Sequence, residues 1–337
     1  MKKDADKFVE KKVRKVPLVV KILIDLITLV LIVAVILGIY IAYFKITKQD
    51  IQPEFLATAI DKITGNYVEP VVISTEPLYT AENYPKIDGS TATIPLAQAF
   101  QANFTGVDLD KVEIKHSKTH QAYEALVKKT VDAILVVEPS EDELKLAKDS
   151  GVEYDITKVV NEGFVFFLNR ANPVDSLTVE QIQDIYSGKI TNWAQVGGND
   201  EPIIAYQRPR NSGSQTGMES LVMKDIKLMD APTENIAAGM MDIIDAVSAY
   251  DNAKGAIGYS YYYYANTMYL SDDIKMLKVN DVAPNNDTIK SGEYPFLTAY
   301  YAVSLKGLNP EADTLKEQML SPRGQQVAEK AGYVPVK

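Results

Sequence analysis

The sequence of 337 residues contains no cysteine, and this absence removes several kinds of chemistry at once. Disulfide bonds, thiolate metal sites, thiol nucleophiles and a lipid-modified cysteine anchor are all excluded. Histidine is scarce as well: only His116 and His120 are present, so a base for a serine nucleophile is hard to find. The rest is the composition of an ordinary folded protein, with 46% hydrophobic and 24% charged residues, long enough for about two domains.

Charge is unevenly distributed along the chain. Residues 1–16 hold seven basic and three acidic residues, a net charge of +4, so the remaining residues must carry −14 to give the chain's total of −10. Binding to nucleic acid needs a basic face that meets the phosphates. We therefore expect no nucleic-acid partner for this acidic body.

An apolar run follows the basic residues. Residues 26–44 contain no charged side chain, which is about the length that crosses a bilayer. The basic flank predicts a cytoplasmic tail (1–16), a transmembrane anchor in the lipid bilayer (17–44) and a juxtamembrane tether (45–84) leading to an extracytoplasmic body. A cleaved signal peptide is the alternative, but "ILGIYIAYF" offers bulky residues where a small-x-small cleavage site is needed.

Beyond residue 85, short apolar runs alternate with amphipathic stretches. Periodicity and the helix start and stop signals predict helices over 95–104, 120–130, 141–151 and 178–188, and strands within 111–117, 132–140, 163–170 and 202–210. This alternation predicts an α/β fold whose sheet is mainly parallel or mixed.

The stretch "QRPRNSGSQTG" at residues 207–217 is rich in residues that bind anions. It has neither the serine spacing of a nucleophile elbow nor the lysine of a Walker phosphate loop. Two interpretations remain. Ser212 or Ser214 caps a helix and the arginines are solvated, or hydroxyls, backbone N–H groups and the guanidinium groups of Arg208 and Arg210 bind an oxyanion.

Two further loops have the same character. "IDGSTATIPLAQAF" (87–100) and "KHSKTHQAY" (115–123) also place hydroxyl residues between an expected strand and an expected helix. We expect the three helix N-termini to converge on one anion at the carboxyl ends of the strands.

Two other patterns could indicate a metal site and a stacking site. His116 and His120 are four residues apart and could bind zinc on one helical face, but no third ligand is evident, so no metal or cofactor is expected. "YSYYYYANTMY" (259–269) could be a stacking platform for sugars or bases. A strand and helix that pack their rings in the core fit the tyrosine content better.

Several segments in order resemble one family. These are "DGSTATIPLAQAF", "PVDSLTVEQIQDIYSGKITNWAQVGG", "QRPRNSGSQTG", "GAIGYSYYYY" and "SPRGQQVAEKAGYVP". Over residues 85–337 the chain is similar to the substrate-binding proteins of bacterial phosphate ABC transporters, the PstS-like family. The resemblance implies a two-lobed periplasmic-binding-protein fold of type II, with lobe 1 formed by residues 85–160 plus 290–337 and lobe 2 by residues 161–289.

The resemblance also implies a function. A non-catalytic protein of this family binds inorganic phosphate in the cleft between its lobes and delivers it to the permease subunits of an ABC importer. With the expected anchor, this chain would be a single-pass protein of a bacterial cell membrane. Binding of another oxyanion such as sulfate or an organophosphate, or a role as a membrane-tethered phosphate sensor, are the alternatives. A phosphoester hydrolase would need a base and usually a metal cluster, and neither is apparent.

The resemblance carries over to particular positions. Thr91 and the backbone of Ala92 match the first phosphate loop of the family, and Thr119 matches the serine of the second. The third loop, Arg-x-x-x-Ser-Gly-Thr, is matched with serine in place of threonine by Arg208, Ser212, Gly213 and Ser214. Further candidates are Ser90, His120 and Arg210. Trp193 lies in "DIYSGKITNW", which the resemblance implies is a structural motif of the family, and we expect it to pack.

One position departs from the family. Members of the family place an aspartate after the second strand, where it accepts the proton of hydrogen phosphate and distinguishes phosphate from sulfate. Here Val137 occupies that register, with Glu138 beside it. Side chains alternate along a strand, so Glu138 normally points away, unless the strand end before Pro139 breaks the alternation. Glu138, His120 or a backbone carbonyl remain as candidate acceptors.

Overall fold

The computed structural model describes residues 76–336, except residues 113, 250–253 and 270. The expected tail (1–16), anchor (17–44) and most of the tether (45–84) lie outside the described residues. Within the described part, no helix has the length and apolar character needed to span a bilayer.

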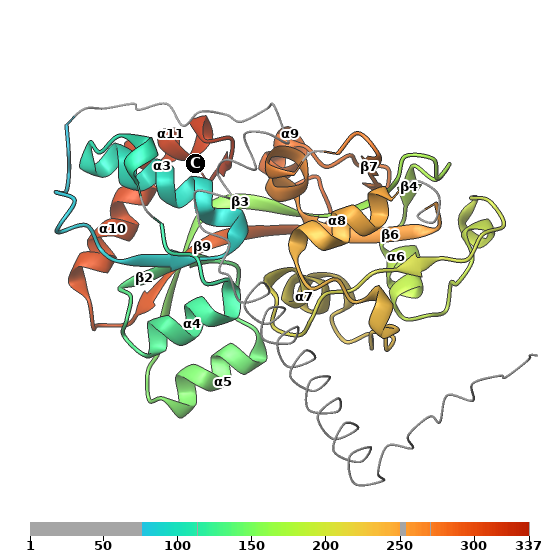
Figure 1. Cartoon of the computed structure of the whole chain (residues 1–337), viewed down its shortest axis with the longest axis horizontal. Helices are drawn as coiled ribbons and strands as arrows, with labels where there is room; N and C mark the ends of the chain where they lie inside the picture. Colours follow the sequence, from blue (N-terminus) through green and yellow to red (C-terminus); the bar gives the residue numbers. More distant parts are fainter. Residues whose placement is uncertain (1–75, 113, 250–253, 270, 337) are drawn as a thin grey trace, which may run out of the picture. The chain divides into compact units, whose positions relative to one another are not determined.

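A mixed sheet of eight strands is the centre of the fold (Figure 1). Its main path runs β1-β2-β9-β3-β6-β5, and β7 and β10 also pair with β3. β1 pairs with β2 and β5 with β6 in parallel, whereas β9, β6, β7 and β10 run antiparallel to β3. The strands are β1 (Ile87–Gly89), β2 (Ala133–Val136), β3 (Tyr154–Asn169), β5 (Ile204–Ala205), β6 (Ala256–Tyr261), β7 (Ile274–Met276), β9 (Leu297–Leu305) and β10 (Val334–Pro335). A separate parallel pair joins β4 (Ser176–Leu177) and β8 (Lys278–Val279).

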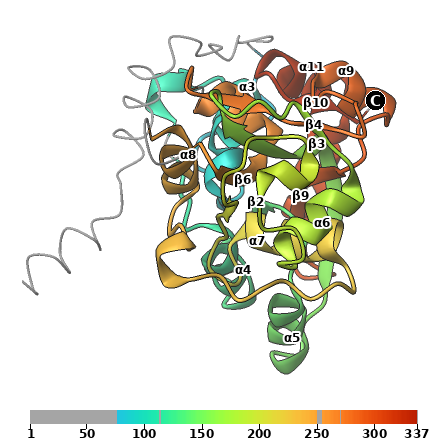
Figure 2. The same ribbon diagram turned by 90° about the vertical axis from the view of Figure 1, so that its right-hand side faces the viewer.

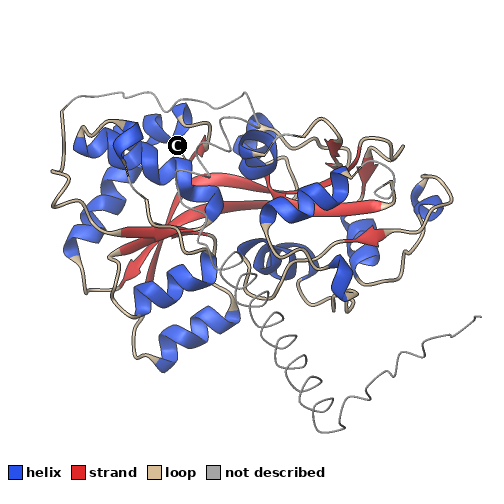
Figure 3. Cartoon of the chain, in the orientation of Figure 1, coloured by secondary structure: helices blue, strands red, loops and turns tan. Residues whose placement is uncertain are grey.

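Strand β3 changes partners half-way along its length. Residues 154–163 pair with β9, and residues 164–168 pair with β6. The residues of β3 after position 158 are almost all buried, which suits a strand that lies between neighbours on both sides. One continuous strand therefore connects the part of the sheet with β1, β2 and β9 to the part with β5, β6 and β7 (Figure 3).

Helices cover both faces of the sheet. Near β2 and β9, helices α3, α10 and α11 lie on one face and α4 and α5 on the opposite face (Figure 1), and Figure 2 shows the same division for α3 and α11 against α4 and α5. At the other end, α8 packs on β6 and β3, and α7 packs on β6. The helices are α3 (Ile94–Thr105), α4 (Thr119–Val127), α5 (Glu141–Asp149), α6 (Val179–Tyr186), α7 (Gly213–Gly217), α8 (Met240–Ser248), α9 (Asn286–Ser291), α10 (Pro310–Leu320) and α11 (Pro322–Lys330).

The predicted helices are confirmed, because α3, α4, α5 and α6 lie within a residue or a few of the expected ranges. Their starts follow from local chemistry. Ser140 before α5 and Thr178 before α6 each accept the backbone N–H three residues on, and Glu143 and Gln181 return the bond as capping boxes.

Two strand predictions need correction. Among the described residues of 111–117 there is no strand, although Val112 and Ile114 are buried in the core. Their apolar side chains pack without a neighbouring strand to pair with, so alternation alone was misleading. Within 202–210 only Ile204–Ala205 form a strand, since Pro202 and Pro209 cannot donate to a ladder.

The aromatic residues pack as expected. Trp193 is fully buried and its indole N–H donates to the carbonyl of Gly255 at 2.9 Å. The tyrosine-rich stretch forms β6 and a following helical turn (Tyr264–Met268), and Tyr263 stacks on Tyr333 with ring centroids 3.6 Å apart. The core interpretation of these tyrosines is therefore confirmed.

Candidate functional site

The ends of β1 and β2 lie side by side and begin the site. These strands are parallel neighbours with Gly89 opposite Leu135, so their carboxyl ends reach the same edge of the sheet. The Ser90 N–H donates to the Leu135 carbonyl at 3.0 Å. A Cβ on Gly89 would lie 2.5 Å from that carbonyl oxygen, so only glycine allows this approach. Residues 90–93 and Val137 therefore leave the sheet together.

Buried Asp88 fastens the second loop to the first. Its carboxylate accepts the backbone N–H and the hydroxyl of Ser117 at 2.6 and 2.7 Å, and Lys115 lies 3.5 Å away. Lys118 follows with φ of 74°, and α4 begins at Thr119. Asp88 thus fixes where α4 starts. This role of Asp88 could not be predicted from the sequence, since an aspartate in a strand gives no sign of which distant residue it will bind.

The third loop approaches the second from the other part of the sheet. A Cβ on Gly213 would lie 2.7 Å from Thr119 Oγ1 and 3.1 Å from a methyl group of Val137. Gly213 begins α7, so the N-terminus of this short helix faces the first turn of α4. Two of the three loops expected to converge are therefore in contact, and the register of β1 and β2 places the first loop at the same edge.

Arg208 is the buried charge of this region. Only 8% of the residue is exposed, and its backbone N–H donates to the Tyr259 hydroxyl and to Gln215 Oε1 at 3.0 and 3.1 Å. The Nε and Nη1 atoms of the guanidinium group are buried without a hydrogen-bond partner. Burial lowers the pKa of Arg208, as expected for a cation removed from water without a paired carboxylate.

Three hydroxyls that follow Arg208 in the same loop and helix share this condition. The side-chain oxygens of Ser212, Ser214 and Thr216 are buried and have no hydrogen-bond partner among the described residues. Ser212 stands at the N-cap position of α7, yet its side chain makes no capping bond, and α4 also begins without a side-chain cap. In contrast, α5, α6, α10 and α11 are each capped by the side chain that precedes them. A simple capping role for Ser212 is therefore not supported.

Buried polar atoms without partners cost free energy unless another group satisfies them. A guanidinium group, three hydroxyls and the uncapped N–H groups of two helix N-termini are all donors. Together they suit a small anion whose oxygens accept from several directions. Within the described residues, no group of three or more Asp, Glu or His side chains is arranged to hold a metal ion.

Comparison with known proteins agrees with this chemistry. Residues 80–321, more than two-thirds of the chain, match the model of the PBP superfamily domain. The chain belongs to the PBP superfamily. Among curated relatives, the phosphate-binding protein PstS of Staphylococcus saprophyticus is 28% identical over 269 residues, which are 75% of this chain and 80% of that protein.

Solved structures of this superfamily have the same fold. A protein from Clostridium perfringens, described as a phosphate ABC transporter substrate-binding protein with bound phosphate, has a TM-score of 0.61 at 26% identity, covering 74% of this chain and 98% of that one. An ABC-type phosphate transport receptor from Vibrio cholerae has a TM-score of 0.56 at 22% identity over the same shares, which shows likeness of fold alone.

Tyrosine hydroxyls hold the first loop, the third loop and the end of β2 in this PBP-superfamily chain. Tyr333 donates to the Ala92 carbonyl at 2.8 Å, Tyr123 to the Val137 carbonyl at 2.8 Å and Tyr261 to the Gly213 carbonyl at 2.7 Å. Each tyrosine is buried, so the bonds are shielded from water. Their role could not be read from the sequence, where buried tyrosines look like core packing.

The first loop places its candidates at the sheet edge. Thr91 is partly exposed and begins a 3₁₀ turn (Thr91–Thr93), while Ala92 is buried. The Ser90 hydroxyl lies 3.4 Å from Thr93 Oγ1, and Thr93 itself bonds the Leu135 carbonyl at 2.7 Å. Ser90 therefore has a partner within its own loop.

Three further candidates make their contacts elsewhere. His120 Nδ1 lies 3.1 Å from Glu143 Oε1, and exposed Glu138 accepts the Tyr301 hydroxyl at 2.7 Å. Arg210 pairs with Asp142 at 2.9 Å, and 75% of its side chain is exposed. Glu138 also lines a small pocket with Val137 and Thr216, whereas His120 and Arg210 pair with carboxylates of α5.

Proposed function

We propose that this chain captures inorganic phosphate on the extracytoplasmic face of a bacterial membrane and delivers it to the permease of an ABC importer. The supporting observation is the buried guanidinium group of Arg208, whose Nε and Nη1 lack a partner, together with three buried hydroxyls of the same segment in the same condition. The relatives named as phosphate-binding proteins support phosphate as the anion. It is a binding protein, and no chemical step is assigned to it.

Binding replaces the hydration of the anion by protein donors. Arg208 supplies the charge and two N–H groups, and Ser212, Ser214 and Thr216 supply hydroxyls. The N–H groups at the starts of α7 and α4 add further donors with the favourable end of each helix dipole. Because the body is acidic, long-range attraction does not help, and affinity depends on these short contacts.

Two lobes would close over the anion. Lobe 1 is formed by residues 85–160 plus 290–337 and lobe 2 by residues 161–289, so that the chain crosses between them within β3 and within α9. The contact between Gly213 and Thr119 then belongs to the closed form. A hinge in the segments that cross between the lobes would separate Gly213 from Thr119 and admit the ligand.

The proposed location of the protein, anchored in the membrane, rests on the sequence. The uncharged run of residues 26–44 and its basic flank support a single-pass anchor with the body outside. If the anchor is kept, mass spectrometry of membrane-extracted protein recovers peptides from residues 1–16. Recovery of chains that begin only beyond Phe44 would replace the anchor by a cleaved leader.

A second candidate is a less selective oxyanion binder. Val137 contacts the Gly213 position and cannot accept a proton, which favours comparable binding of sulfate. Isothermal titration of the full chain in detergent with phosphate, sulfate and a phosphate monoester distinguishes these functions. Phosphate binding at least tenfold tighter than the other two supports the proposal. Absence of phosphate binding overturns it.

A further inference from the structure

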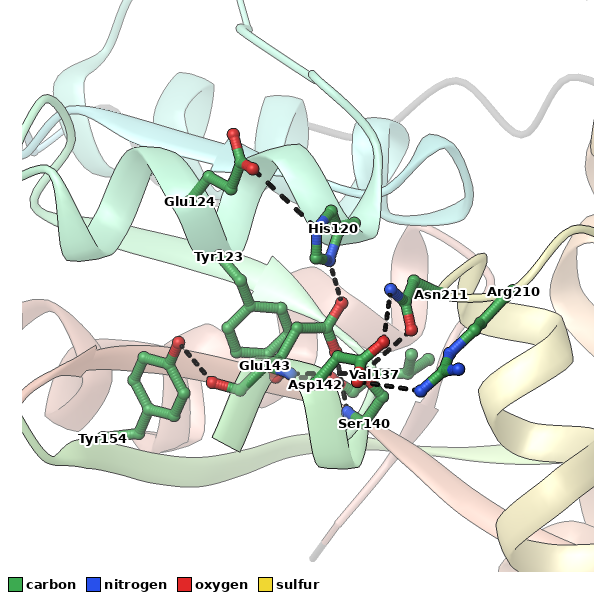
Figure 4. A network of polar contacts seen from close by, with 10 residues as sticks. All are labelled: His120, Tyr123, Glu124, Val137, Ser140, Asp142, Glu143, Tyr154, Arg210 and Asn211. Atoms are coloured by element: carbon green, nitrogen blue, oxygen red, sulfur yellow. Dashed lines mark hydrogen bonds and ion pairs between the residues drawn. The ribbon is translucent and has the colours of Figure 1, made fainter. Parts of the chain in front are cut away.

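The loop that carries the buried donors is also attached to α5, at a point outside the proposed anion site. Asp142, in the first turn of α5, uses both carboxylate oxygens. Oδ1 accepts from Arg210 Nη2 at 2.9 Å and Oδ2 accepts from Asn211 Nδ2 at 3.0 Å (Figure 4). Arg210 and Asn211 directly precede Ser212, so one carboxylate holds the base of the anion loop.

A backbone turn at Asn211 separates the contacts that the loop makes with α5 from those that it makes with Thr119. Asn211 has φ of 64°, a left-handed conformation that asparagine tolerates better than most residues. Before this turn, the side chains of Arg210 and Asn211 reach α5. After it, Gly213 lies against Thr119.

The N-terminal turn of α5 is firmly connected to the element that carries Thr119. Glu143 is fully buried, accepts the Ser140 N–H at 2.7 Å and lies 3.1 Å from His120 on α4. The Tyr154 hydroxyl of β3 donates to the Glu143 carbonyl at 3.1 Å (Figure 4). Asp142 and Thr119 therefore belong to one packed unit, and a movement that separates Gly213 from Thr119 also separates Asp142 from its partners.

The exposure of the partners allows this contact to open. The side chains of Arg210 and Asp142 are 75% and 36% exposed, so both can be rehydrated when they part. Arg208 and Thr119 are buried, and their contacts cannot be exchanged for water while the loop is closed.

We propose that Asp142 is a latch residue that holds the anion loop closed through Arg210 and Asn211 without touching the ligand. The inference rests on the proposed function, because a latch matters only if an anion is retained under the loop. It assigns Arg210, which the sequence placed among the candidate ligands, a positioning role.

The latch predicts an effect on release rather than on capture. In Asp142→Ala the dissociation rate of phosphate from the full chain should rise about three- to tenfold, with the association rate nearly unchanged. Arg210→Ala should have the same effect to a smaller extent, since Asn211 still donates to Asp142, and the double variant should release phosphate no faster than Asp142→Ala, which already removes the Arg210 contact. Asn211→Asp, which sets a carboxylate against Asp142, should also accelerate release.

Asp149→Ala is the matched control, since Asp149 lies at the other end of α5 in an ion pair with Lys145. Stopped-flow release and thermal unfolding of the ligand-free protein are measured for every variant. If Asp142→Ala releases phosphate like Asp149→Ala, or if the Asp142 and Arg210 effects simply add, the latch is overturned while phosphate binding by the wild type stands. If the wild type binds no phosphate, the proposed function fails and the latch fails with it.

Discussion

The Tyr261 hydroxyl donates a hydrogen bond to the Gly213 carbonyl at 2.7 Å. Tyr261 is a buried residue of the central strand β6, whereas Gly213 is the first residue of α7. The bond connects the core of the sheet directly to the loop that carries the unpaired donors. The orientation of the loop is thus fixed by Tyr261, a residue of the sheet that the ligand need not contact.

Tyr261→Phe should therefore weaken phosphate binding. The Gly213 carbonyl loses its donor in a buried place, at a cost of about 1–2 kcal/mol that is shared between stability and affinity. Titration calorimetry and thermal unfolding measure the two parts. Tyr294→Phe is the control, because Tyr294 donates to the Phe164 carbonyl at 3.2 Å elsewhere in the core. Equal affinity in the two variants would show that Tyr261 acts on the fold alone.

Arg208→Ala should weaken phosphate binding strongly. It removes the buried guanidinium group and should weaken phosphate affinity by about 2–4 kcal/mol, with little effect on the fold. Arg208→Lys should recover only part of the loss, since an ammonium group cannot present the two N–H groups of the fork. Calorimetry checks both, with Arg170→Ala as a control arginine that bonds backbone carbonyls of residues 272 and 274. Undiminished affinity in Arg208→Ala would show that this guanidinium group does not bind the anion.

Gly213→Ala tests the contact between the second and third loops. The new Cβ would lie 2.7 Å from Thr119 Oγ1 and 3.1 Å from Val137, so closure should cost about 1–3 kcal/mol. The expected result is weaker phosphate binding with an unchanged unfolding temperature of the ligand-free protein. Gly239→Ala serves for comparison, because its Cβ meets only the Asp242 carboxylate. A fall in ligand-free stability as large as the loss in binding would contradict a contact made only on closure.

Glu162 should make stability depend on pH. Burial raises the pKa of this β3 residue from its ordinary value of 4.5 to about 8. Between these values the folded state binds more protons than the unfolded state, so stability falls as pH rises from about 5 to 8, by at most about 1.4 kcal/mol per pH unit. Urea unfolding of wild type and Glu162→Gln across this range measures the difference, which should level off above pH 8. A constant difference would mean that Glu162 does not titrate there.

The discrimination between phosphate and sulfate should not depend on Glu138. Its exposed carboxylate accepts from the Tyr301 hydroxyl at 2.7 Å. The side chains without partners around Arg208 include hydroxyls, which can accept a proton as well as donate one. Glu138→Gln should therefore leave the ratio of phosphate to sulfate affinity within about twofold of wild type in competition titrations. A clear narrowing of the ratio would identify Glu138 as the acceptor.

The sequence determined the elements whose signals are local. Helix α5 could be placed from Ser140 and Glu143, three residues apart, and its amphipathic pattern. The loop at 207–217 stood out because serine, glycine and arginine lie next to each other in the chain. Such features depend on neighbouring residues, whose preferences act before any long-range contact forms.

Only the tertiary structure decided how distant segments meet. Arg208 and Arg210 are two residues apart and looked alike in the sequence, yet one is buried and the other is exposed beside Asp142, 68 residues away. Strand β3 was recognised by its apolar second half, while its first half is a strand because β9 pairs with it. Pairing across such separations depends on which surfaces the whole chain brings together, and a window of neighbouring residues does not contain that information.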